Sequence, residues 1–100
     1  MNHAELQENF NKSEIVGMYA FYDTKSERYD TPFFCQNDLF AQRHYKMVTD
    51  RSETMLNTFQ GDFDLNRLGF VNVLDGSYTE AFGAVVCGQT YKKNQEATKS

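Results

Sequence analysis

Tryptophan is absent from this 100-residue sequence and proline occurs once. No apolar run approaches the roughly 18–20 residues that a membrane-spanning helix needs. Residues 1–14, MNHAELQENFNKSE, are polar and acidic and lack the hydrophobic region of a secretory signal. We therefore expect a cytosolic protein with no membrane contact. The two cysteines, Cys35 and Cys87, lie in apolar stretches, which predicts small buried side chains and no disulfide.

Signatures of catalysis and metal binding are also missing. The chain has no phosphate-binding loop, dinucleotide fingerprint, zinc-protease, serine-hydrolase or EF-hand pattern. His44 with Asp38 or Tyr45 is a weak acid–base candidate, because a lone histidine in a helix is more often structural or exposed. Asp62 with Asp64 is a weak magnesium candidate, because a third ligand is not obvious. The sequence predicts a protein that is not an enzyme and has no catalytic residue, cofactor or metal site.

Aromatic side chains, in contrast, are abundant: nine phenylalanines and six tyrosines. This content does not fit a disordered chain, and the length fits one domain with a modest core. The net charge is −4, divided into −2 for residues 1–14, −4 for residues 15–90 and +2 for residues 91–100. An acidic domain works against nonspecific binding to phosphates, although a local basic face is compatible with it.

The first half of the chain predicts a hairpin. Residues 15–22 and 28–35 are rich in β-branched and aromatic types, as strands are. The polar residues 23–27 between them are turn formers. Pro32 lacks an amide proton, so it suits the edge of a sheet.

A helix should follow this hairpin. Asn37 or Asp38 is a natural N-cap, and apolar residues recur at helical spacing after it. The pattern predicts a helix that ends within residues 51–54. Residues 55–60 form a connection of uncertain structure.

The second half predicts another hairpin. Residues 63–74 alternate as a strand, with odd-numbered residues on one face and even-numbered residues on the other. Asp75-Gly76 is typical of a two-residue type I′ turn. Residues 77–87 return as the last strand.

These elements predict an α+β fold, in the order strand, strand, helix, strand, strand. The expected architecture is a four-stranded, mainly antiparallel sheet with one helix packed on a face. The domain should span residues 15–88, preceded by a mobile leader over residues 1–14 and followed by a solvated tail over residues 89–100. Because one helix covers only one face, the other face would expose apolar side chains, which favours a homodimer or larger assembly. Its aromatic side chains would come from among Tyr19, Phe21, Tyr22, Phe33, Phe34 and Tyr78.

Single-stranded nucleic acid is the best binding candidate that the residues offer. Proteins that bind single strands combine aromatic platforms with cations that follow the phosphates. The candidate side chains are Tyr19, Tyr22, Tyr29, Lys25, Arg28, Arg43, Lys46 and Arg51. The alternative is that the strand aromatics form core and the helix cations form a solvated face. No RNA-recognition or helix-turn-helix signature decides between the two.

The stretch IVGMYAFYDTKSERYDTPFFCQNDLFAQRHYKMV, with GDFDLNRLGFVNVLDGSYTE after it, resembles the small nonstructural protein of gokushovirus-type microviruses, which are single-stranded DNA phages. The leader and the stretch AFGAVVCGQTYKK depart from the family pattern. The matching positions are Tyr19, Tyr22, Asp23, Tyr29, Pro32, Phe33, Asn37, Asp38, Ala41, Arg43, Tyr45, Asp62, Phe63, Leu65, Leu68, Gly69, Phe70, Asp75 and Gly76.

The resemblance implies a non-enzymatic phage protein in the host bacterial cytoplasm that acts in viral DNA replication or genome packaging. It brings no catalytic residues. Two hypotheses remain open. The first is direct binding of single-stranded DNA by a homodimer. The second is a protein–protein adaptor for the replication initiator or the procapsid, which does not touch DNA; the acidic charge favours the second.

Overall fold

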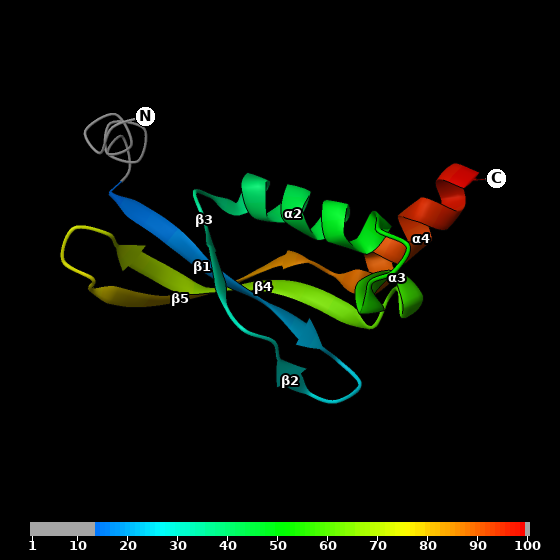
Figure 1. Cartoon of the computed structure of the whole chain (residues 1–100), viewed down its shortest axis with the longest axis horizontal. Coiled ribbons are helices and arrows are strands. Elements are labelled where there is room, and N and C mark those ends of the chain that lie inside the picture. The colour runs from blue at the N-terminus through cyan, green and yellow to red at the C-terminus, as the bar shows by residue number, and fades with distance from the viewer. Residues whose placement is uncertain (1–13, 100) are drawn as a thin grey trace.

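The computed structural model describes residues 14–99, which form an antiparallel sheet with helices packed on it (Figure 1). The strand order is β2-β1-β4-β5, and β3 also pairs with β1. The predicted α+β class is confirmed, whereas residues 1–13 of the predicted leader lie outside the described residues. The elements are β1 (Ile15–Asp23), β2 (Arg28–Tyr29), β3 (Phe33–Cys35), α2 (Asp38–Asp50), α3 (Met55–Thr58), β4 (Phe63–Asn72), β5 (Tyr78–Val86) and α4 (Gly88–Lys99).

The strand predicted over residues 28–35 is divided into two short pieces. β2 pairs with the end of β1, and β3 pairs with its middle. Between them, the Asp30 amide donates to the Phe21 carbonyl at 2.9 Å, so the chain stays beside β1. Pro32 has no N–H to continue the ladder, which explains the interruption there.

α2 lies over one face of the sheet (Figure 1). Asn37 caps it as predicted, because its side-chain oxygen accepts from the Phe40 amide at 3.1 Å. The helix buries Ala41 and Tyr45 against the sheet. The core cluster consists of Tyr19, Phe21, Ala41, Tyr45 and Leu65, with Phe33, Cys35, Leu56, Val85, Val86 and Tyr91 packed against it.

A β-bulge interrupts the alternation predicted for β4. Tyr19 of β1 pairs with Arg67, whereas Met18 pairs with Gly69, so Leu68 is an extra residue. Beyond the bulge the faces exchange. The Arg67 guanidinium consequently lies 4.9 Å from the centre of the Phe70 ring, on the same face. The strict odd–even pattern was therefore wrong beyond Arg67.

The connection between β4 and β5 is also longer than predicted. The Asn72 amide donates to the Ser77 carbonyl at 2.9 Å, which closes a loop over residues 73–76. Gly76 has a φ of 76°, but Asp75 has no positive φ. A type I′ turn needs positive φ at both central residues, so the two-residue turn is corrected to this longer loop.

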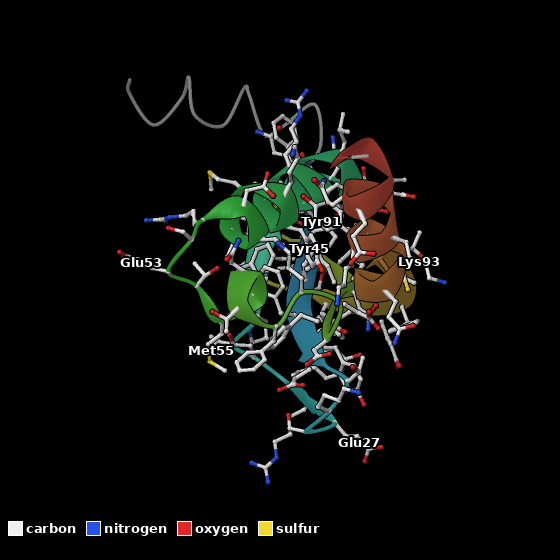
Figure 2. All side chains as sticks on the ribbon, turned by 90° about the vertical axis from the view of Figure 1, so that its right-hand side faces the viewer. Glu27, Tyr45, Glu53, Met55, Tyr91 and Lys93 are labelled. Atoms are coloured by element: carbon white, nitrogen blue, oxygen red, sulfur yellow. The ribbon has the colours of Figure 1, made fainter. Side chains whose placement is uncertain are left out.

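The C-terminal end differs most from the prediction. Residues 88–99 form α4 rather than a solvated tail. The Tyr91 ring packs edge-on against Tyr45 at 5.2 Å between ring centres, and Figure 2 shows the two side chains together. The Gly88 amide donates to the Asp64 carboxylate at 2.8 Å. These contacts attach α4 to the domain, so the domain extends beyond residue 88.

Candidate nucleic-acid interface

The sheet face opposite α2 carries no helix in the described part of the chain. α2 covers one face, whereas α3 and α4 lie at one end of the sheet (Figure 1). We call the uncovered side the open face. Phe34 pairs with Met18 on this face, and the Tyr78 ring fills the space beside Gly69, which is the other partner of Met18. Phe34 is 57% exposed and Tyr78 is 49% exposed.

Two tyrosines form an aromatic pair at the β2 end of the open face. The rings of Tyr22 and Tyr29 have centres 4.7 Å apart and are tilted by 55°. The Asn66 amide donates to the Tyr29 hydroxyl at 3.1 Å, and Asn66 itself is buried. This hydrogen bond fixes the tyrosine pair against the sheet while part of the Tyr29 ring stays exposed.

The turn between β1 and β2 presents the nearest cations. The Asp23 carboxylate accepts from the amides of Lys25 and Ser26, and these hydrogen bonds, the Lys25 one first, hold the pKa of Asp23 below its usual range. Lys25 and Arg28 are exposed on this turn. We call Tyr22, Lys25, Arg28 and Tyr29 the hairpin site.

Carboxylates partly offset the cations of the hairpin site. Asp23, Glu27 and Asp30 lie on the same turn or directly after it. The site therefore offers aromatic surface more than positive potential, and binding there would depend on stacking.

A shallow apolar groove adjoins the hairpin site. It has a volume of about 290 Å³ and lies between the turn and α3. Arg28 and Tyr29 line one side of it, and Met55 on the other side is 63% exposed. The remaining lining residues are Phe21, Asp23, Ser26, Asp30, Leu56 and Phe63.

The helix cations that the sequence grouped with these residues lie elsewhere. α2 packs over one face of the sheet, whereas β2 is the edge strand beside the end of β1 (Figure 1). The Lys46 ammonium pairs with Asp50 at 2.8 Å, and the Arg43 guanidinium lies 5.8 Å from the centre of the Phe40 ring. Arg51 is the exposed C-cap of α2. The structure thus separates one predicted set into a hairpin group and a helix group.

Tyr19 has no exposed surface and belongs to the core. Its hydroxyl donates to one Asp38 oxygen at 2.7 Å, and Arg67 donates to the other at 2.7 Å. Burial is the main cause that raises the pKa of Tyr19, and the Asp38 carboxylate adds to it. Because a buried ring cannot stack on a base, the predicted interface role of Tyr19 is corrected to a structural one.

The cysteines and the histidine also have defined surroundings. Cys35 packs against the core, and burial raises the pKa of its thiol. Cys87 is exposed, so the expectation that it is buried was wrong. The His44 ring packs 4.7 Å from Phe33 and 6.0 Å from Phe21.

Residues 14–99 contain no group of three or more His, Cys, Asp or Glu side chains placed to hold a metal ion. Within the same residues, no helix has the length and apolar character needed to cross a membrane.

A family model described as Phage ORF5 protein matches residues 16–90. The chain belongs to the Phage ORF5 protein family. No curated protein and no solved structure matches it. The match confirms that the resemblance is to a phage protein, and it is consistent with the microvirus type. The matched residues include almost all of the sheet, α2 and the hairpin site.

Sequence reasoning missed part of the open face. Phe82 was not among the candidates, although it is 62% exposed and alternation along β5 places it on the open face with Glu80 and Ala84. The period-two pattern of residues 78–84 carries that signal. The groove beside α3 had no signal, because it forms only where residues distant in sequence meet.

Proposed function

We propose that this protein acts without catalysis in replication or packaging of the phage genome, by binding single-stranded DNA as a homodimer in the host bacterial cytoplasm. The observation that carries the proposal is the open face with its exposed aromatic side chains. Proteins that bind single strands use such sheet surfaces because each base can stack on an aromatic ring. The hairpin site adds Lys25 on the turn at one end of this surface, and Arg28 in the groove next to it.

A second function has its own support. The outer side of α2 exposes Leu39, Phe40 and Met47, at 55%, 44% and 56%. Apolar side chains on a solvated helix favour contact with another protein. The acidic net charge of −4 points the same way. The alternative is therefore an adaptor for the replication initiator or the procapsid.

Fluorescence anisotropy with a short labelled oligothymidine tests the first function. We expect affinity to fall between about 50 mM and about 200 mM salt, because each neutralised phosphate releases counterions. Tyr29→Ala should weaken binding by about fivefold or more, since one stacked base contributes about 1–3 kcal/mol. Arg28→Ala should weaken binding and reduce the salt slope by about one.

Lys93→Ala is the matched control for Arg28→Ala. Lys93 is also an exposed cation, but it lies on α4, far from the turn that carries Glu27 (Figure 2). It should leave the affinity unchanged. Absence of binding at low salt would refute direct DNA binding, and Met47→Asp in pull-downs with phage initiator and capsid proteins would then test the adaptor.

A further inference from the structure

The two edges of the sheet are built differently. One edge consists of β2 and β3, which have two and three residues and are separated by a segment with Pro32. Short strands and proline are the usual means of preventing another chain from pairing with an edge. This edge is therefore closed to further strand pairing.

The other edge is β5, and it has none of these protections. It runs for nine residues without proline, and no strand within residues 14–99 pairs with its outer side. Glu80 is its one charged residue. Phe82, at the middle of the strand, is 62% exposed. A long edge with a single charged residue and no covering strand is a template for an added strand.

We propose that β5 pairs with β5 of a second copy of this chain, in antiparallel orientation about a two-fold axis at Phe82. Two identical strands related by a two-fold axis across a sheet edge run antiparallel, so the contact is self-complementary. The inference rests on the homodimer of the proposed function and not on DNA binding.

The register follows from the bounds of the strand. Among antiparallel pairings of two copies of Tyr78–Val86, the one with its axis at Phe82 brings the full length of both strands together. The β5 irregularity at Val85 lies near the ends of this pairing, away from its centre. The pairing sets Phe82 against the partner's Phe82, which forms an aromatic cross-strand pair. It also sets Glu80 opposite the partner's Ala84, so like charges do not face each other.

Pairing of a second copy at the β5 edge leaves the open face uncovered. Edge pairing joins the two sheets, and the open faces of both copies become one surface. The exposed Phe34 and Tyr78 of each copy stay accessible in this arrangement. An interface through the open face itself would instead bury these side chains.

Size-exclusion chromatography with light scattering tests the interface. We expect the protein to be a dimer at micromolar concentration, and Phe82→Asp to raise the dimer dissociation constant by about tenfold or more. Phe34→Asp is the matched control, because Phe34 has similar exposure on the same face but lies at the β3 edge. It should leave the dimer intact.

Disulfide crosslinking tests the register. Glu80→Cys and Ala84→Cys variants are made in a Cys87→Ser background and oxidised alone and as a mixture. The mixture should form linked dimers about tenfold faster than either variant alone, because pairing raises the effective concentration of the two thiols. Equal rates overturn the register.

The other outcomes of these experiments also test the proposed β5–β5 interface. A monomeric protein, or a dimer that Phe82→Asp leaves intact, overturns edge pairing. Loss of the dimer in Phe34→Asp but not in Phe82→Asp assigns the interface to the open face instead. Anisotropy with oligothymidine is read separately, so absent DNA binding refutes the proposed function and leaves edge pairing standing.

Discussion

Replacing Arg67 by methionine should be among the most costly single changes at the boundary between α2 and the sheet. The Arg67 guanidinium donates to Asp38 at the start of α2 at 2.7 Å, and its Nε donates to the Ala81 carbonyl at 3.0 Å. Asp38 also accepts from Tyr19. One side chain therefore connects β4, β5 and α2.

The expected magnitude follows from the burial of this network. Hydrogen bonds to charged groups contribute about 1.5–3 kcal/mol, and the Asp38 side chain is 45% exposed, so solvent screening reduces its share. Arg67→Met keeps the apolar stem but removes the guanidinium and its stacking on Phe70. We expect a loss of about 2 kcal/mol in unfolding free energy, which corresponds to about 8–16 °C in Tm for a domain of this size.

Lys46→Met provides the matched control. The Lys46–Asp50 pair has nearly the same distance, 2.8 Å against 2.7 Å, but the Lys46 side chain is 61% exposed whereas that of Arg67 is 21% exposed. Loss of this surface pair should cost much less unfolding free energy than Arg67→Met, because solvent screens the two charges. Urea unfolding followed by circular dichroism measures both variants. Equal costs for the two would refute the reasoning from burial.

Three further predictions concern pH, thiol reactivity and close packing. Burial raises the pKa of Tyr45 from 10.0 to about 12. The stabilising contribution of neutral Tyr45 should therefore be complete below pH 10. Above pH 10 the free energy of unfolding should fall by up to about 1.4 kcal/mol per pH unit, as measured by urea midpoints. A flat pH profile contradicts this. Cys87 should react with a thiol reagent faster than Cys35. A backbone hydrogen bond from Thr90 lowers the pKa of Cys87, whereas burial raises the pKa of Cys35. Equal rates for the two thiols in a two-phase assay contradict this. Gly88→Ala should destabilise the domain by about 1–3 kcal/mol in urea unfolding, because a Cβ there would collide with a β4 carbonyl, and an unchanged midpoint contradicts this.

Local signals located most of the elements correctly. Asn37 stands ahead of an apolar stripe, so its side chain caps α2 in the structure as the sequence indicated. The polar run at residues 23–27 separates two apolar stretches and forms the turn between β1 and β2. These features depend on neighbouring residues alone, which is why periodicity and turn chemistry were sufficient.

Long-range contacts account for the errors. Leu68 forms a bulge that exchanges the faces of β4, and no local pattern marks it because the partner strand defines the bulge. Residues 88–99 have a polar composition typical of a tail. They form α4, which is attached through Tyr91 to Tyr45, a residue distant in sequence.

In the candidate site, too, local sequence predicted some features and long-range contacts decided the others. Sequence alone identified Tyr19, Tyr22 and Tyr29 as strand aromatics, but it did not distinguish a core ring from an exposed one. α2 packs over the face that holds Tyr19, which leaves the face with Tyr22 open. Composition and local pattern determined the elements, their order and the abundance of aromatic side chains. Only the tertiary structure decided which of them remain exposed, because burial depends on where the helix packs.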